Sequence, residues 1–379
     1  MARQVFSNAI ILEGEELEAT RGYLVVRDGA IERISGGAAP GRAVNLKYGF
    51  ILPPFINAHT HIADSVAKEL YLGKEQPQVV APGGVKFRAL SSTPLKDIIT
   101  ATRAALLDML STGTLAHCDF RERGVAGVDI LRRVSTTPVK SFILGRPLNF
   151  RELSKVLAKA DGIGLPSLNA FSPDELGEIA HQTQMANKLL AVHVAETRAA
   201  QEVSAEQTGE GEVKRALELY PSFVVHATHA TADDFLSLQK RGVPAVFCPR
   251  ANSILGAGVP PIHLALEAGT RFYFGTDNVL ACQPNMFEEI SFAWACLRAS
   301  NPAAGSDEAR KLLMAATIEP LRTFDLPWGP VAEGGRATFM LLARGNNLQN
   351  LSDIYAGLIN RARADNIQAV FLDGKIVIS

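Results

Sequence analysis

Short apolar runs alternate with amphipathic segments over most of the chain. Segments with helical patterning, such as 94–110 and 174–188, separate most of these runs. The eight runs lie at 55–61, 113–120, 141–147, 163–171, 189–196, 222–228, 244–249 and 271–277. Eight strands that alternate with helices are typical of a (β/α)8 barrel. We therefore predict an α/β chain built around a TIM-type barrel.

The two ends of the chain share a second pattern. Residues 23–34 and 369–378 each contain two β-rich runs joined by Asp-Gly, which predicts a hairpin because the tight turn needs positive φ. Residues 337–342 add another strand. We expect a small β-sandwich domain formed by both termini, with residues 1–50 and 330–379 as its parts and the barrel at 51–329.

Residues 67–93 form one long stretch without clear periodicity, and Pro82-Gly83-Gly84 lies inside it. A structureless loop of this length in a compact domain is often functional, for instance as a lid over a site. A disordered insertion explains the pattern equally well.

Composition narrows the class of protein. Apolar residues make up 47% of the 379 residues and charged residues 20%, so the chain can bury a large core and remain soluble. With a net charge of −1, the chain has no excess of positive charge that would attract nucleic acid or an anionic membrane. No apolar run approaches a membrane span, and the four cysteines form no C-x-x-C pair. We expect a cytoplasmic protein with reduced thiols and a small-molecule partner, and a homo-oligomer stays open.

Histidines mark the ends of several predicted strands. His59 and His61 are two residues apart in the first run, so their side chains point to the same side of a strand. His193 follows the apolar residues 189–192 of the fifth run, and Glu196 must lie past the strand end to reach the same cavity. His226 closes the strand that is expected in the sixth run.

Asp277 ends the eighth run, and a carboxylate buried there needs a positive partner such as a divalent cation. In a barrel, the C-terminal strand ends form the active site. His59, His61, His193 and Asp277 would therefore meet there as ligands. Three or four protein ligands with one open water position are the pattern of a catalytic metal site.

The chain resembles the amidohydrolase superfamily, and within it the branch of cytosine, guanine and S-adenosylhomocysteine deaminases and triazine hydrolases. The matching segments are Pro53–His61, Gly113-Thr-Leu, His193–Glu196, His226–His229, Cys248–Asn252 and Gly275–Asp277. The resemblance implies that His59, His61, His193 and Asp277 bind the metal. It also implies catalytic roles for Glu196 and His226, and a single metal ion, because no bridging lysine is present. Leu115-Ala116 and His117 depart from the family pattern.

These residues predict a hydrolytic mechanism with one divalent metal, zinc by preference and iron as the alternative. The metal would activate water, Asp277 would take its proton, and His226 would orient it. Glu196 would protonate a ring nitrogen of the substrate. We therefore expect an aminohydrolase, a deaminase, that acts on a heterocycle of purine, pyrimidine or pterin type.

Two other functions stay open: hydrolysis of a cyclic amide or a carbon–halogen bond at the same site, and a catalytically silent metal-binding scaffold. Five further residues near predicted strand ends are candidates for substrate contacts: His117, Arg121, Arg146, Arg250 and Asn252. An arginine there could grip a carboxylate or phosphate with its planar guanidinium.

Overall fold

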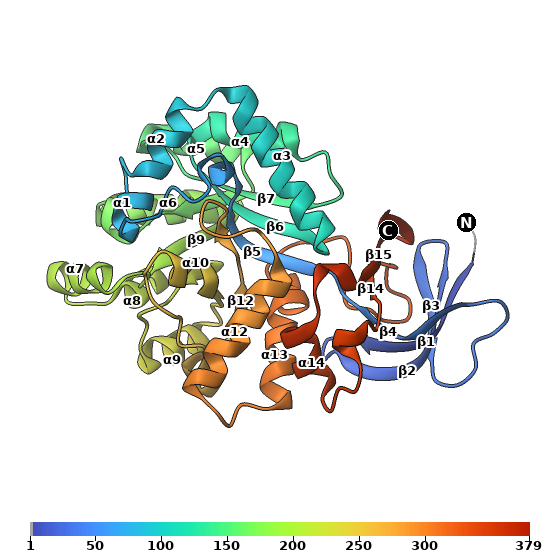
Figure 1. Ribbon diagram of the computed structural model, residues 1–379. Coiled ribbons are helices and arrows are strands. Elements are labelled where there is room, and N and C mark those ends of the chain that lie inside the picture. The colour runs from blue at the N-terminus through green and yellow to red at the C-terminus, as the bar shows by residue number, and fades with distance from the viewer. Residues whose placement is uncertain (1–2) are drawn as a thin grey trace. The chain divides into compact units, whose positions relative to one another are not determined.

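The computed structural model describes residues 3–379 of this mixed α/β chain (Figure 1). The chain forms two compact units. One contains Met1–Ile56, Met109–Leu115 and Ala303–Ser379, and the other contains Asn57–Asp108 and Ala116–Pro302.

Strands from both ends of the chain form one seven-stranded sheet with the order β16-β15-β14-β4-β1-β2-β3. The N-terminal and C-terminal parts join where β14 pairs antiparallel with β4. The bounds are β1 Gln4–Glu13, β2 Glu18–Arg27, β3 Ala30–Ser35, β4 Val44–Leu52, β14 Phe339–Leu342, β15 Ile367–Leu372 and β16 Lys375–Ile378.

Both predicted hairpins are confirmed, because β2 pairs with β3 and β15 pairs with β16. Their Asp-Gly turns have positive φ at all four residues: Asp28, Gly29, Asp373 and Gly374. The apolar faces of the strands share one core, in which Phe6, Phe339 and Phe371 make mutual ring contacts.

The second sheet is the predicted barrel, with the order β12-β11-β10-β9-β8-β7-β6-β5-β13. The bounds are β5 Phe55–His61, β6 Thr114–Arg121, β7 Lys140–Gly145, β8 Gly162–Leu165, β9 Leu189–Val194, β10 Phe223–His226, β11 Ala245–Phe247, β12 Phe272–Phe274 and β13 Asp277–Asn278. β12 and β13 are two pieces of the eighth strand. The barrel closes because β13 pairs in parallel with β5, with Asp277 opposite Thr60.

Helices follow most barrel strands (Figure 1). Their bounds are α3 Leu95–Ser111, α4 Gly124–Val134, α5 Leu153–Lys159, α6 Pro173–Met185, α7 Arg198–Thr208, α8 Glu212–Leu217, α9 Ala232–Arg241, α10 Pro249–Ile254, α11 Ile262–Ala268, α12 Met286–Ser300 and α13 Ser306–Thr317, and α14 Ile354–Arg361 lies near the C-terminus. A capping box begins α9: Thr231 Oγ1 accepts from Asp234 N, and the Asp234 carboxylate accepts from Thr231 N.

The expectation that 67–93 lacks secondary structure was wrong. This segment contains two short helices, α1 Gln76–Val80 and α2 Val85–Ser92. Val79 and Ala67 are buried in a small apolar cluster with Leu255 and Leu280, so the segment packs against the barrel loops. These contacts are nonlocal, so the short sequence pattern could not reveal them.

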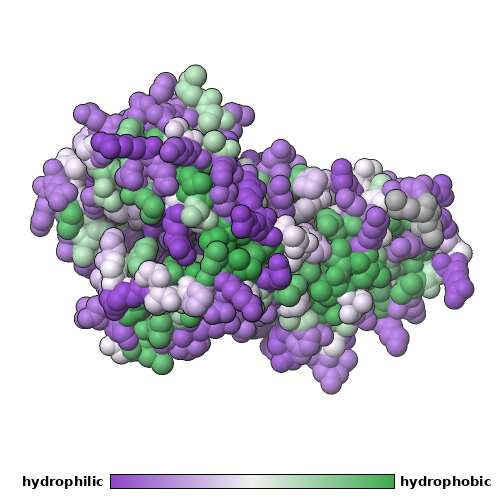
Figure 2. Space-filling model, turned by 90° about the horizontal axis from the view of Figure 1, so that it is seen from above, coloured by the Kyte–Doolittle hydropathy of each residue, from purple (hydrophilic) through white to green (hydrophobic). Residues whose placement is uncertain are grey.

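On the face shown in Figure 2, hydrophilic side chains surround limited hydrophobic areas. Within residues 3–379, no helix combines the length and the apolar character that crossing a membrane requires.

Candidate active site

Two imidazoles enter the barrel from its first strand. His59 and His61 of β5 are both buried, and their ring centroids lie 5.0 Å apart. Asp277, at the start of β13, lies beside both of them. Its Oδ1 is 3.3 Å from His59 Nε2 and 3.6 Å from His61 Nε2.

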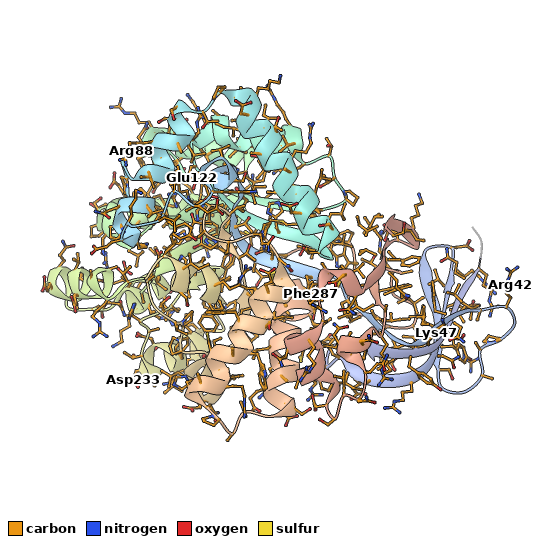
Figure 3. All side chains as sticks on the ribbon, viewed as in Figure 1. Arg42, Lys47, Arg88, Glu122, Asp233 and Phe287 are labelled. Carbon is orange, nitrogen blue, oxygen red and sulfur yellow. The ribbon has the colours of Figure 1, made fainter. Side chains whose placement is uncertain are left out.

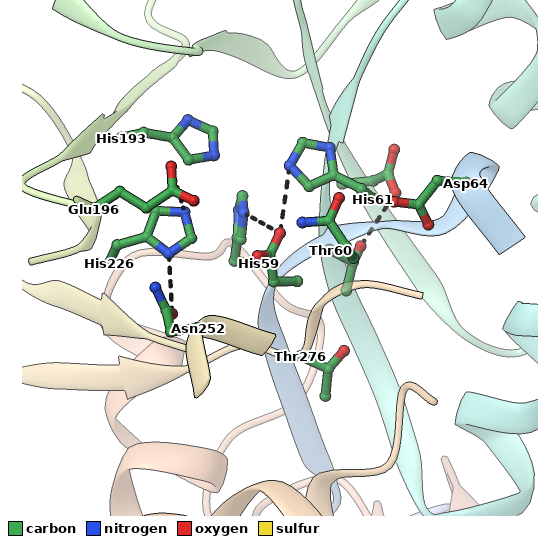
Figure 4. Close-up of polar contacts among 12 residues, drawn as sticks. His59, Thr60, His61, Asp64, His193, Glu196, His226, Asn252 and Thr276 are labelled. Carbon is green, nitrogen blue, oxygen red and sulfur yellow. Dashed lines mark hydrogen bonds and ion pairs between the residues drawn. The ribbon is translucent and has the colours of Figure 1, made fainter. Parts of the chain in front are cut away.

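Two more imidazoles come from neighbouring strands. His193 of β9 and His226 of β10 have ring centroids 5.0 Å and 5.6 Å from that of His59. Figure 4 shows the four rings around a common space, with Glu196 at its edge. Parallel strands end at the same rim, so residues up to 218 positions apart in sequence meet here.

The side chains form two overlapping groups that could hold a metal ion. One is His59, His61 and Asp277, and the other is His59, His193 and His226, with the ligand atoms of each group within 4.8 Å of one another. The groups contain the four expected ligands and also His226, for which the sequence indicated a catalytic role.

The donor set fits a divalent cation. Both nitrogens of His59 and Oδ1 of Asp277 are buried and have no hydrogen-bond partner among the described residues. Burial lowers the pKa of His59 to about 3 and that of His193 well below its usual value, so both rings are neutral near pH 7. Neutral imidazole has the lone pair that a metal needs, and a cation would satisfy the orphaned atoms.

Neighbouring oxygens orient two of the rings. His193 Nδ1 lies 2.7 Å from the carbonyl oxygen of Leu165, and His226 Nδ1 lies 3.2 Å from Asn252 Oδ1. These oxygens accept only, so each Nδ1 carries the proton and each Nε2 keeps its lone pair. A partner on the far nitrogen is typical of histidines that bind metals.

The backbone is strained where the site residues leave the strands. His226 and Asp277 have φ of 73° and 56°, and Ala195, just before Glu196, has φ of 48°. Residues other than glycine rarely adopt this left-handed conformation, and it is common at functional sites. The turn after β9 places Glu196 past the strand end, as predicted from the three-residue spacing.

Close packing next to His59 holds the first and eighth strands together. A Cβ at Gly275 would lie 2.6 Å from the Cβ of His59 and 2.7 Å from its backbone nitrogen, so only glycine fits. Asn57 and Thr276 add two reciprocal hydrogen bonds of 2.7 and 3.0 Å. This contact brings Asp277 to the histidines.

Glu196 lines a cavity of about 940 Å³ together with His61, His193, His226 and Asp277. Its Oε2 is 3.8 Å from His226 Nε2, and its Oε1 accepts a 2.6 Å hydrogen bond from Gln76 Nε2 of α1. The cavity wall combines apolar side chains, such as Phe87 and Leu148, with charged ones. Both α1 and α2 contribute to this wall.

Of the five candidate substrate contacts, only Arg146 lines this cavity. Its Nε is buried without a hydrogen-bond partner, and no carboxylate among residues 3–379 forms an ion pair with it. Arg121 instead pairs with Asp119 at 3.2 Å, and Arg250 pairs with Glu288. Both arginines therefore lie outside the cavity lining and are bound by local carboxylates.

His117 and Asn252 also lie outside the cavity lining. His117 lies 3.0 Å from Thr60 Oγ1 and 2.7 Å from Ser141 Oγ, which makes it a packed polar residue of the barrel interior. Asn252 contacts His226 and donates to Thr228 Oγ1 at 3.0 Å. It therefore holds His226 in place and does not line the cavity.

Two charged residues of the site were missed in the sequence. Glu122 is buried inside the fold (Figure 3), and its Oε1 lies 2.8 Å from His61 Nδ1. Burial alone would raise the pKa of Glu122, but the charge of Lys86 and the contact with His61 hold it well below its usual value. Glu122 directly follows β6, so the strand-end criterion could have found it. Lys86 lies in the 67–93 segment, where no sequence signal marked it.

Comparison with known proteins places this geometry in a family. The sequence profile of the Amidohydrolase family matches residues 50–377. A protein from Methanothermobacter thermautotrophicus, named as an aminohydrolase, is 32% identical over 98% of both chains. A 5-methylthioadenosine/S-adenosylhomocysteine deaminase from Caldanaerobacter subterraneus subsp. tengcongensis is 25% identical over 99% of this chain and 92% of its own.

A solved structure has the same fold at low sequence identity. It is the atrazine chlorohydrolase TrzN from Arthrobacter aurescens TC1 complexed with zinc, with a TM-score of 0.82 at 17% identity. The match covers 98% of this chain and 94% of that one.

Proposed function

Because the chain belongs to the amidohydrolase family, we propose that it is a metal-dependent deaminase of an aminated nitrogen heterocycle of purine, pyrimidine or pterin type. The chain is a hydrolase that acts on carbon–nitrogen bonds other than peptide bonds. One observation carries the finer proposal: the carboxylate of Glu196 faces both His226 and the cavity, next to the metal-ligand groups.

His59, His61, His193 and Asp277 would hold one divalent metal ion. Imidazole nitrogens and one carboxylate suit zinc, and iron is the alternative. When bound, the ion lowers the pKa of a water ligand toward neutrality and so supplies the nucleophile. Zinc in the similar chlorohydrolase structure supports the choice of metal.

The protein residues would divide the proton transfers. Asp277 accepts the proton of the attacking water, and His226 holds that water through Nε2, since its Nδ1 is occupied by Asn252. Glu196 delivers a proton to a ring nitrogen, which makes the adjacent C–NH2 carbon electrophilic. The amine leaves as ammonia after Asp277 passes to it the proton taken from the water. The remaining hydroxyl proton is released as the carbonyl forms, and it restores the proton that Glu196 gave to the ring nitrogen.

The volume of the cavity favours a substrate larger than a free base. Its volume of about 940 Å³ is near the upper end of small-molecule sites, which span about 300–1,000 Å³. Arg146 in the wall has no ion-pair partner among residues 3–379, so an anionic substituent on the substrate would give it one. Phe87, Leu90 and Leu148 would cover the apolar part.

The test is a screen for ammonia release by metal-reconstituted protein. The panel contains aminated purines, pyrimidines and pterins, each as a free base, as a nucleoside and with a carboxylate side chain where available. A cyclic amide and a chlorinated triazine serve as comparison substrates. Ammonia release that needs both metal and Glu196 supports deamination. Chloride release or ring opening without ammonia would favour the alternative hydrolysis, and no turnover of any compound would favour a silent scaffold.

A further inference from the structure

A buried row of charged side chains leads from α2 to one of the proposed metal ligands. Lys86 Nζ lies 2.6 Å from Glu122 Oε1, and the same oxygen lies 2.8 Å from His61 Nδ1. All three residues are at most 3% exposed. One carboxylate oxygen therefore contacts the lysine and the histidine together.

Lys86 contacts two further acceptors. Its Nζ lies 3.0 Å from Asn278 Oδ1 and 3.7 Å from Asp64 Oδ2. Asn278 directly follows Asp277, and Asp64 follows His61 by three residues. A single ammonium group from α2 thus contacts two side chains that lie close in sequence to proposed ligands, one near the first strand and one on the eighth. A buried ammonium needs such partners because it has three donors and no acceptor.

The two ring nitrogens of His61 face different carboxylates, Nδ1 that of Glu122 and Nε2 that of Asp277. His61 Nε2 faces Asp277 Oδ1 at 3.6 Å, within the donor group that contains His59. A carboxylate on the far nitrogen fixes the orientation of a ligating imidazole and raises its basicity. Glu122 can do this only if its own carboxylate is held in place.

We propose that Lys86 is a positioning residue that holds Glu122 against His61 and so directs His61 Nε2 toward the metal. The proposal rests on the proposed metal site. It gives the segment 67–93 a part in building the site, beyond covering the cavity. The sequence contains no motif for this role, since Lys86 reaches the site only through the fold of α2.

Lys86 also lines the cavity, so a direct contact with substrate is the main alternative. Its surroundings argue against that role. Its ammonium group already donates a hydrogen bond to Asn278 and forms ion pairs with Glu122 and Asp64. A substrate group would have to displace one of these contacts, whereas Arg146 in the same cavity has no ion-pair partner among residues 3–379.

The test measures the metal site directly. Metal affinity is determined by chelator competition with zinc, and ligand geometry by the visible absorption of cobalt-substituted protein. The variants are Lys86→Met, Lys86→Arg, Glu122→Gln and the double variant Lys86→Met/Glu122→Gln. Lys74→Met is the matched control, because Lys74 is exposed in the same segment. Melting of the metal-free proteins reports folding.

We expect Lys86→Met and Glu122→Gln each to weaken zinc binding about 10- to 100-fold and to change the cobalt spectrum. The double variant should be no weaker than Glu122→Gln alone, because both changes break the same contact with His61. Lys86→Arg keeps the charge and should recover part of the affinity. Lys74→Met should match the parent.

Folded Lys86→Met with the zinc affinity and cobalt spectrum of the parent would overturn the proposal. If Lys86→Met does not fold, because Glu122 is left buried and unpaired, the double variant and Lys86→Arg decide the matter. A double variant with parental affinity, or additive losses, would contradict the role. None of these measurements needs a substrate, so failure to find deamination leaves them unaffected. A parent protein that binds no metal would refute the metal site itself.

Discussion

Gln76 donates a 2.6 Å hydrogen bond to Glu196, a residue 120 positions further along the chain. The hydrogen bond holds Oε1, and Oε2 then faces His226. The bond therefore fixes the orientation of the carboxylate in the cavity. Gln76 begins α1, which the sequence pattern did not predict.

Replacing Gln76 with leucine should lower kcat by about 10- to 100-fold, because a hydrogen bond to a charged group contributes about 1.5–3 kcal/mol. Metal content should stay unchanged. Gln78→Leu is the control, since Gln78 caps the same helix by accepting from Glu75 N but does not contact Glu196. Equal losses of kcat in the two variants would mean that only the stability of α1 matters.

Glu196→Gln should retain fold and metal but lose about 10²–10⁴-fold in turnover. Glutamine keeps the size of the side chain but cannot transfer a proton. The side chain borders the cavity and is 21% exposed, so the core stays intact. The measurements are metal stoichiometry, Tm and kcat beside the parent. Turnover near that of the parent with full metal would remove the shuttle role, and lost metal would make Glu196 a ligand.

Elemental analysis of protein purified without chelator should give close to one transition metal per chain. Removing the metal should lower Tm, because Asp277 and His59 would keep buried polar atoms without a partner. His226→Gln should retain the metal and lose turnover, whereas Asp277→Ala should lose both. A reproducible two metals per chain, or loss of metal in His226→Gln, would require a different ligand set.

Arg146→Met should raise KM for a substrate with an anionic substituent by about 10-fold or more, since a charge-assisted contact is lost. The value of kcat should change little, because Arg146 would bind the anionic group equally well in the ground state and in the transition state. The matched measurement uses the same heterocycle without the anionic group, whose KM should be insensitive to the change. Equal effects on both substrates would argue that Arg146 only shapes the cavity.

The stability of the protein should depend on pH through Glu289. Burial raises the pKa of this fully buried carboxyl from 4.5 to about 8. The protonated carboxyl therefore contributes its full share of the folding stability below pH 4.5. This contribution is lost as the pH rises from 4.5 through about 8. At about 1.4 kcal/mol per pH unit, and less as the folded carboxyl itself ionises near pH 8, the parent should lose roughly 2 kcal/mol relative to Glu289→Gln between pH 6 and 8. Denaturant unfolding of both proteins at the two pH values measures this difference, and parallel pH profiles would contradict it.

Local pattern was enough to predict the barrel and to name the candidate metal ligands at its rim. The period of the apolar runs predicts strands and helices, and Asp-Gly predicts the terminal hairpins, because both depend on residues close together in sequence. His59, His61, His193 and Asp277 could be found because parallel strands in a barrel share one active rim. The proposed domain bounds, 1–50, 51–329 and 330–379, stay a prediction.

Only the tertiary structure decided which charged side chains are already paired. Arg121, Arg146 and Arg250 look alike in sequence, yet Arg121 and Arg250 bind nearby carboxylates and Arg146 faces the cavity. Lys86 and Gln76 lie in a segment without periodicity and reach the site through two short helices. Such contacts depend on the positions of residues far apart in sequence, and no local pattern encodes them.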